Sequence, residues 1–258
     1  MLRPRIIPCL LIHEGGLVKT VGFKDPKYVG DPVNAVKIFN EKESDELVVL
    51  DIDATVNGVE PDFAVIAHLA AECRMPLCYG GGVRNAAQAK QIIGLGVEKV
   101  AISAAAIERP ELISEIAAEI GSQSVVVVID VRKKMMGGHE VRTHNGKKAH
   151  KLDPVMFAQE AVRLGAGEIV VNSIDLDGTM KGYDLKLARR IRDAVRVPVT
   201  FLGGAGSLAD IEALIREVGV VGASAGSLFV FKGTYRAVLI NYPNPDTKEQ
   251  MVRAALAA

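Results

Sequence analysis

FLGGAGSLADIEALIREVGVVGASAGS, residues 201–227, repeats the order of YGGGVRNAAQAKQIIGLGVEKVAISAAA, residues 79–106. Each copy begins with a hydrophobic strand that ends in glycines, continues into an amphipathic helix and returns to a second strand. A shorter pair, LDIDATVNG at 50–58 and NSIDLDGTMKG at 172–182, recurs in the same order. Because both pairs are offset by about 122 residues, near half the chain, the sequence predicts two similar halves of four strand–helix units each.

Short hydrophobic runs extend this pattern to the whole chain of 258 residues. Most are near-continuous Val, Ile and Leu, as is typical of parallel strands buried on both faces. Asp31-Pro32 and Asp153-Pro154 indicate helix starts between them. The pattern predicts a single (β/α)8 TIM barrel domain over residues 1–258, with a doubly wound sheet as the alternative. The expected strands are 5–12, 46–51, 76–79, 99–102, 124–130, 168–172, 198–202 and 219–222.

Composition argues against several classes of protein. The chain is 49% hydrophobic, and its 31 basic and 31 acidic residues leave no basic excess for nucleic acid. No apolar run approaches the ~20 residues of a membrane span, and we expect no signal peptide. The three cysteines (Cys9, Cys73, Cys78) and the five histidines show no metal-ligand spacing. We expect a cytoplasmic protein with no metal, no cofactor, and neither nucleic acid nor membrane as a partner.

Two connections are longer than the others, His13–Gly30 and Val131–Leu152. The second contains Asn145-Gly146 between two strand-like runs, which predicts a hairpin. In a barrel both connections would follow strands at the C-terminal face, where barrel enzymes place their active sites. Both are therefore candidates for functional loops.

Glycine-rich segments follow three of the expected strands, at 80–82, 203–206 and 222–227. Glycine lets backbone N–H groups approach a phosphoryl group closely, and the loops after strands seven and eight form the usual phosphate site of a barrel. The repeat implies a second site across the barrel mouth, near Gly82 and Ser103-Ala104. The sequence thus predicts two sites for a phosphorylated small molecule; the alternative is that the glycines only turn the chain.

Carboxylates stand at the ends of several expected strands. Asp130 follows VVVVI and closes the fifth strand, which makes it the leading candidate for general acid–base chemistry. The alternative is a structural carboxylate that orients a loop, and this alternative has more weight for Asp51 and Asp175. Asp53 and Asp177 complete the set.

Ionisable residues open four of the strands. Arg5, Glu46, Lys99 and Glu168 begin strands one, two, four and six. Their charges balance, so they could form ion pairs across the bottom of the barrel axis. From the residues alone, a stabilising network is the favoured interpretation, because the N-terminal face of a barrel usually serves stability.

The strings RIIPCL, DELVVLDI, YGGGV, GSQSVVVVID, GAGEIVVNSIDLDGTMKGYD and GGAG together resemble the HisF-type cyclase subunit of imidazole glycerol phosphate synthase, over nearly the whole chain. The resemblance implies a barrel that pairs at its N-terminal face with a HisH-type glutaminase. Ammonia from glutamine would enter at the barrel bottom and travel along its axis. At the top it would react with a bisphosphorylated ribulosyl-aminoimidazole. The products of this lyase reaction of histidine biosynthesis are imidazole glycerol phosphate and an aminoimidazole carboxamide ribotide.

The resemblance also implies roles for individual residues. Asp130 matches one of two catalytic aspartates, and Lys19 matches a lysine of a mobile first loop. Gly82 matches the first phosphate site, beside Ser103. The second phosphate site is matched by Asp177, Gly178, Gly204, Gly226 and Ser227. The ammonia gate is matched by Arg5, Glu46, Lys99 and Glu168, which reverses the preference for a purely stabilising network.

One stretch departs from the family. Its other catalytic aspartate closes strand one as IPCLD, whereas residues 7–16 read IPCLLIHEGG and place Leu11 there. Leucine cannot transfer a proton, and loss of a positioned general acid costs ~10²–10⁴-fold in rate. The first phosphate site has Ser103-Ala104 in place of an Asn-Thr pair, and Leu176 replaces a basic residue.

These departures predict that histidine-pathway cyclisation is lost or weakened while ammonia transfer is kept, so whether the chain is itself an enzyme stays open. GGLVKT and GSLFVFKGTYRAVLINYP resemble a branch that works with a glutaminase and a sugar amidotransferase. That branch makes an acetamidino sugar for surface polysaccharide (lipopolysaccharide O-antigen). One alternative is an authentic cyclase that uses His13 or Glu14 as a substitute acid. The other is a non-catalytic phosphate-binding scaffold.

Overall fold

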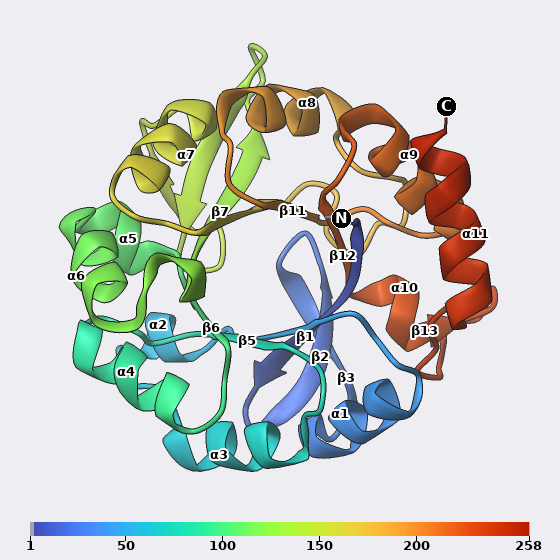
Figure 1. Cartoon of the computed structure of the whole chain (residues 1–258), viewed down its shortest axis with the longest axis horizontal. Helices are drawn as coiled ribbons and strands as arrows, with labels where there is room; N and C mark the ends of the chain where they lie inside the picture. Colours follow the sequence, from blue (N-terminus) through green and yellow to red (C-terminus); the bar gives the residue numbers. More distant parts are fainter. Residues whose placement is uncertain (1–2, 258) are drawn as a thin grey trace.

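The computed structural model describes residues 3–257 and forms a closed barrel of parallel strands (Figure 1). The barrel strands are β1 (Arg5–His13), β4 (Leu47–Asp51), β5 (Leu77–Gly80), β6 (Lys99–Ile102), β7 (Val125–Lys133), β10 (Glu168–Ser173), β11 (Val199–Leu202) and β12 (Gly222–Ala225). Each is paired in parallel with both of its neighbours, and the β7–β10 and β12–β1 pairs close the circle. The predicted (β/α)8 barrel is confirmed, and a doubly wound open sheet is ruled out.

Helices surround the barrel and cover the outer face of its sheet (Figure 1). They are α1 (Pro32–Glu41), α2 (Ala54–Asn57), α3 (Phe63–Glu72), α4 (Ala86–Gly94), α5 (Ala104–Glu108), α6 (Glu111–Ile120), η1 (Ser122–Ser124, a 3-10 turn), α7 (Pro154–Arg163), α8 (Leu185–Ala194), α9 (Leu208–Val218), α10 (Ser227–Val230) and α11 (Pro245–Leu256). At the predicted helix starts, Asp31 and Asp153 accept hydrogen bonds from first-turn amides of α1 and α7.

The two halves of the chain repeat one another. The order β5–α4–β6–α5 recurs as β11–α9–β12–α10. The helix caps show the same offset: Asn85 caps α4, and Ser207 caps α9 122 residues later. In both halves a short helix follows directly after the last strand of the repeat. The internal similarity of the sequence therefore corresponds to two similar half-barrels.

The eighth barrel strand differs from the prediction. It is Gly222–Ala225 rather than 219–222. Gly219 ends α9 with φ +77°, and pairing with β1 begins only at Gly222. A Cβ on the first glycine of this strand would lie 2.0 Å from the Thr200 hydroxyl of β11, so the close approach requires glycine. Segment 222–227 is thus mostly strand, not a glycine loop, and only Gly226-Ser227 follows it.

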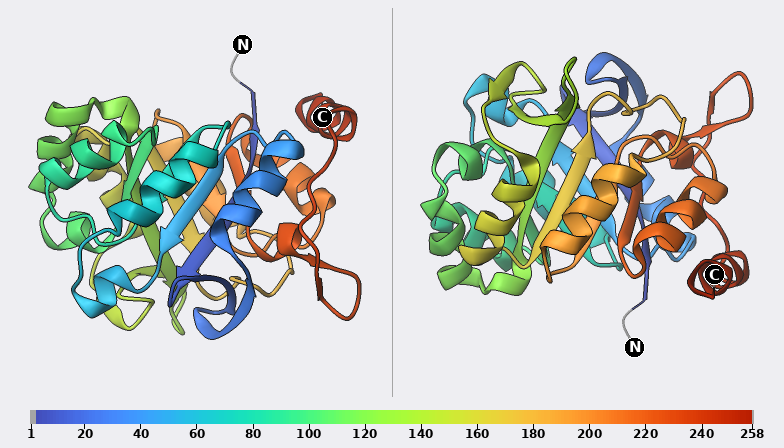
Figure 2. Two further views of the ribbon diagram at one scale, coloured as in Figure 1. Left: turned by 90° about the horizontal axis from the view of Figure 1, so that it is seen from below. Right: turned by 90° about the horizontal axis from the view of Figure 1, so that it is seen from above.

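Two antiparallel hairpins extend from the C-terminal ends of β1 and β7, on the face opposite the N-terminus (Figure 2). Their strands are β2 (Gly16–Val21), β3 (Lys24–Gly30), β8 (His139–Thr143) and β9 (Lys148–His150). The β8–β9 hairpin, with Asn145-Gly146 in its turn, confirms the prediction. The β2–β3 hairpin corrects the expected loop over 13–30, and it continues the sheet beside β1. A further small hairpin follows α10, formed by β13 (Phe231–Lys232) and β14 (Ala237–Val238).

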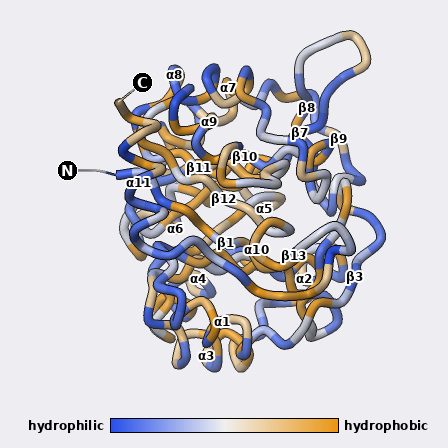
Figure 3. Tube along the Cα trace, turned by 90° about the vertical axis from the view of Figure 1, so that its right-hand side faces the viewer, coloured by the Kyte–Doolittle hydropathy of each residue, from blue (hydrophilic) through white to orange (hydrophobic). Residues whose placement is uncertain are grey.

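The barrel wall separates two apolar cores. Side chains alternate between the two faces of a strand, so Ile6 and Leu10 of β1 pack outward against helices, whereas Ile7 and Cys9 point into the lumen. The buried lumen residues are Ile7, Cys9, Val48, Cys78, Ala101, Val126, Val128, Val170 and Leu202. In Figure 3 apolar stretches follow the barrel strands, and hydrophilic stretches lie mainly at the periphery.

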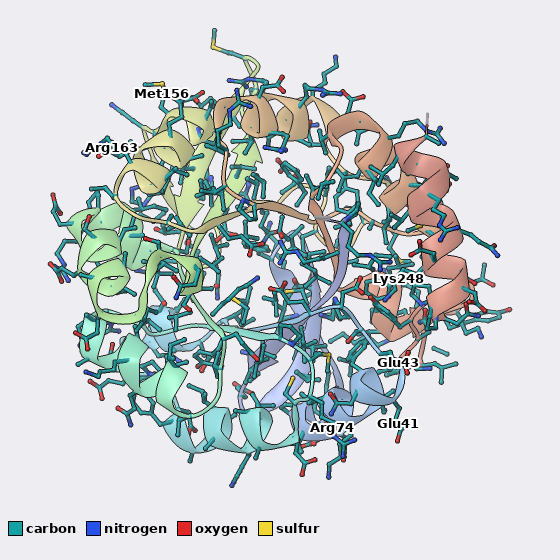
Figure 4. All side chains as sticks on the ribbon, in the orientation of Figure 1. Glu41, Glu43, Arg74, Met156, Arg163 and Lys248 are labelled. Atoms are coloured by element: carbon teal, nitrogen blue, oxygen red, sulfur yellow. The ribbon has the colours of Figure 1, made fainter. Side chains whose placement is uncertain are left out.

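Charged side chains gather on the outer surface of the helical ring, as Figure 4 shows for Arg163 and Glu41. Lys248 is an exception, because it is only 9% exposed. It projects from α11, and its Nζ atom lies 2.5 Å from Asp45 just before β4. This contact fastens the last helix to the N-terminal side of the barrel.

Candidate functional site

Four charged residues form one ring of ion pairs inside the N-terminal end of the barrel. The Arg5 guanidinium lies 2.7 Å from a Glu168 oxygen and also pairs with Glu46. Lys99 Nζ lies 2.8 Å from each of the two glutamates. Thr200 adds to the ring by donating a 2.6 Å hydrogen bond to Glu168. The four predicted residues therefore meet across the barrel. Alternate residues of a strand face the same side, and each of the four is an even number of positions from a lumen residue of its strand.

The two acids of the ring are far more buried than its two bases. Glu46 and Glu168 are 3% and 4% exposed. Burial raises the pKa of Glu168, but the positive charges of Arg5 and Lys99 outweigh it and lower this pKa to about 2. The same ion pairs outweigh burial at Lys99 and raise its pKa. Lys99 and Glu168 are thus charged at neutral pH.

The opposite end of the lumen opens into a cavity of about 140 Å³ that contains Asp130. Asp130 lies in β7 rather than at its end, because the next three residues continue the strand by pairing with β8. Asn172 of β10 donates a 3.0 Å hydrogen bond to the Asp130 carboxylate. Burial raises the pKa of Asp130 to about 7, against the effect of this hydrogen bond. A carboxyl group of this kind suits general acid–base chemistry near neutral pH.

The hydrogen bond from Asn172 stabilises the charged form of the Asp130 carboxylate and so lowers its pKa. We therefore expect Asn172→Ala, which removes this bond, to raise the pKa of Asp130 by about 1. Carbon-13 NMR titration of the aspartate carboxyl groups would measure it. Asn145→Ala is the matched control, since Asn145 lines the same cavity but donates to the Ile52 carbonyl. Equal Asp130 pKa values in wild type and Asn172→Ala would contradict the assigned role of the hydrogen bond.

The residues predicted for the first phosphate site line the same cavity. Gly82 and Ser103 both line it, and the buried Ser103 hydroxyl has no hydrogen-bond partner among the described residues. Gly82 has φ +73°, and a Cβ there would lie 2.9 Å from the Val59 carbonyl. Glycine is therefore needed for the close approach of this loop to the β4–α3 connection.

A second, smaller cavity lies beside the first and contains the residues predicted for the other phosphate site. Asp177, Gly178, Gly204, Gly226 and Ser227 all line it. At Gly178 (φ +68°) and Gly204 (φ +113°) a Cβ would lie 2.0 Å from a backbone oxygen. The Asp177 carboxylate accepts hydrogen bonds from the Thr20 hydroxyl and the Phe23 amide, so it fixes the β2–β3 hairpin over this cavity.

Lys19 is placed differently from the expectation of a mobile loop. It lies in β2, is 5% exposed and donates a hydrogen bond to the Cys9 carbonyl. Its side chain thus turns into the second cavity, and burial lowers its pKa. Hairpin pairing with β1 accounts for the difference, because it holds the backbone of this segment in the sheet.

Leu11 stands between the two cavities. It has the parity of the lumen residues, and with Phe23 and Asn172 it lines both cavities. An aspartate at this position would therefore face the same space as Asp130. Neither His13 nor Glu14 lines either cavity, and His13 Nδ1 lies 2.7 Å from Asp53.

Three of the candidate carboxylates, Asp51, Asp53 and Asp175, accept hydrogen bonds from backbone amides, a contact that fits the structural alternative given for Asp51 and Asp175. Asp51 accepts hydrogen bonds from the amides of Asp53 and Ala54, and Asp53 accepts from the amide of Glu14. Asp175 accepts a 2.7 Å bond from the Lys133 amide. Sequence reasoning missed Asn172 and Thr200. Both stand two residues from an inward-facing residue of the same strand, so the alternation of side chains could have identified them.

Within residues 3–257, no three His, Cys, Asp or Glu side chains come close enough together to hold a metal ion. No helix in this part of the chain is long and apolar enough to cross a membrane.

These features define a (β/α)8 barrel protein with paired cavities at the C-terminal ends of its strands and a charged ring at the other end. Residues 5–236 match the family model described as histidine biosynthesis protein, and the chain belongs to this family.

Individual relatives agree over almost their full lengths. The chain is 55% identical over 252 residues to a Leptospira interrogans protein provisionally named imidazole glycerol phosphate synthase subunit HisF, covering 97% of this chain and 99% of the relative. It is 55% identical over 251 residues to a Vibrio vulnificus (strain YJ016) protein provisionally named subunit hisF3 (97% and 96% covered). It is 54% identical over 244 residues to a Pseudomonas aeruginosa protein provisionally named subunit hisF2 (95% and 97% covered).

Proposed function

We propose that this chain is the HisF-like barrel subunit of a cytoplasmic glutamine amidotransferase complex for acetamidino-sugar formation in surface polysaccharide biosynthesis. A HisH-type glutaminase docks at the N-terminal face and is activated by the barrel. Its ammonia passes through the lumen to a sugar amidotransferase at the opposite face, and histidine-pathway cyclisation is lost or weakened. The observation that carries this proposal is a complete charged ring combined with Leu11 where a second carboxylate would face Asp130.

The character of the lumen supports an ammonia route. Between the ring and Asp130 the lumen is lined by small and apolar side chains such as Cys9, Cys78 and Ala101. Neutral ammonia crosses such a lining at much lower cost than an ion, which would lose its hydration. In the ring, the side chains of Arg5 and Lys99 are 24% and 19% exposed, whereas the glutamates are buried. In this proposal the two bases move aside to admit ammonia.

Adding the barrel to a HisH-type glutaminase is expected to increase glutamine hydrolysis about tenfold or more, a typical size for coupling between sites. Glutamate release and free ammonia would be measured together. Lys99→Ala should change the fraction of ammonia that escapes, whereas Lys90→Ala, on the exposed surface of α4, should not. No stimulation by the wild-type barrel would refute the proposal.

The second candidate is an authentic cyclase of histidine biosynthesis. It is favoured by Asp130, whose pKa of about 7 is that of a working acid–base group, and by the relatives named as synthase subunits. This candidate needs a second acid, and the positions of His13 and Glu14 outside both cavities argue against either of them.

A further inference from the structure

The β13–β14 hairpin carries an arginine to the edge of the second cavity. Arg236 is partly buried, whereas its neighbours Tyr235 and Ala237 are exposed. Its guanidinium stacks over the Phe231 ring, 4.7 Å from the ring centroid. Nη2 of the same group lies 3.4 Å from the Gly178 carbonyl, a residue that lines the second cavity. The hairpin therefore holds a positive charge at the rim of this cavity.

The same nitrogen of Arg236 also approaches Ser227. It lies 3.5 Å from the Ser227 hydroxyl, and this serine is only 6% exposed and lines the cavity. Both contacts of Nη2 are long, and a guanidinium has five N–H donors in a planar fork. Among residues 3–257 no ion pair joins Arg236 to a carboxylate. Most of its hydrogen-bonding capacity thus remains available to a ligand.

A second basic side chain, Lys19, lines the same cavity. Lys19 uses one of its three N–H donors on the Cys9 carbonyl, and a Cβ on Gly226 would lie 2.9 Å from Lys19 Nζ. The one carboxylate that lines this cavity, Asp177, already accepts two hydrogen bonds from the β2–β3 hairpin. Two basic side chains, Arg236 and Lys19, together with one carboxylate that already has hydrogen-bond partners, favour the binding of an anionic ligand.

The backbone of Arg236 is also unusual. Its φ is +49°, in the left-handed region that residues with a side chain rarely adopt. Its amide donates a 3.0 Å hydrogen bond to the Gly233 carbonyl, which closes the turn. A glycine at this position would adopt the same conformation without strain, yet the chain has an arginine there, and its side chain contacts residues at the rim of the cavity.

We propose that Arg236 binds the phosphoryl group of a small phosphorylated ligand in the second cavity, which Lys19 also lines. A planar guanidinium can donate two parallel hydrogen bonds to phosphate oxygens, which a lysine cannot. This assignment rests on the second phosphate site predicted from the sequence, which the HisF-like barrel of the proposed function would keep, and it adds a ligand residue to that site.

The test is titration of the full chain with inorganic phosphate. Binding is monitored through the amide NMR signals of Gly178, Gly226 and Ser227. Arg236→Gly keeps the turn and removes the cation, and it is expected to weaken binding at these amides about tenfold or more. Arg236→Lys should fall between this variant and wild type. Lys232→Ala removes an exposed charge from the same hairpin and should leave binding within about twofold of wild type.

Phosphate binding that is equal in wild type and Arg236→Gly would overturn the role of Arg236 alone. Equal weakening by Lys232→Ala would also overturn it, because the effect would then be one of general charge. No phosphate response at the three amides of wild type would overturn both Arg236 and the second phosphate site. Since the titration needs neither a glutaminase nor a cyclase substrate, each of these results is distinct from failure of glutaminase activation.

Discussion

Glu168→Ala is expected to lower the free energy of unfolding by about 3–5 kcal/mol, the usual cost of removing one partner from a buried ion pair. Glu168 is 4% exposed and contacts Arg5, Lys99 and Thr200. Without it, two cations inside the barrel end share Glu46 alone. Urea unfolding at pH 7 would measure the loss. Because three strands contribute the contacting side chains, the effect should appear in global unfolding.

The matched control is Glu212→Ala. Glu212 pairs with Arg216 one turn along α9, on the protein surface. An exposed pair at this spacing is worth about 0.5 kcal/mol or less. Similar losses for Glu168→Ala and Glu212→Ala would contradict the importance given to the ring.

The ring also predicts a pH dependence with a defined sign. The folded-state pKa of Glu168 is lowered to about 2, so the unfolded chain binds this proton first as the pH falls. The stabilisation is complete above about pH 5 and is lost as the pH falls toward 2. The difference in unfolding free energy between wild type and Glu168→Gln should shrink by about 3 kcal/mol over that interval. A constant difference would show that the ring does not hold Glu168 ionised.

The barrel and the ring were predictable for related reasons. A strand buried on both faces reads as a continuous apolar run, and eight such runs at regular spacing favour closure. A charged side chain at the start of such a run points either toward the helices or into the barrel lumen. Arg5, Glu46, Lys99 and Glu168 stand two residues before inward-facing positions of their strands, and alternation alone brings them to the axis.

The parts that the sequence did not predict depend on contacts between distant segments. The Gly-Ala-Ser composition of β12 is that of a loop, and the strand exists because β1 and β11 lie on either side of it. The β2–β3 hairpin depends on anchorage of Thr20 by Asp177, 157 residues away. Arg236 reaches the rim of the second cavity only because its hairpin folds back toward Gly178. Local pattern carries no signal for such contacts.

Leu11→Asp is expected to gain cyclase turnover of the bisphosphorylated ribulosyl-aminoimidazole substrate, with saturating ammonium salt in place of a glutaminase. A positioned general acid is worth ~10²–10⁴-fold, so wild type should be slower than the variant by about this factor. Leu11 pairs with Leu50 of β4 and Val18 of β2, so an aspartate there would be held by sheet on both sides. Its carboxylate would enter the cavity that contains Asp130.

Leu11→Asn controls for the change in size and polarity, because it supplies an amide without an acid and loses the same apolar contacts. It should stay at the wild-type rate, and Asp130→Asn combined with Leu11→Asp should return to that rate. Two carboxylates facing one cavity also push their pKa values apart, so the pKa of Asp130, already about 7, should rise further in Leu11→Asp. Robust turnover by wild type would instead restore the cyclase, and the charged ring would then deliver ammonia to chemistry inside this barrel rather than to a further protein.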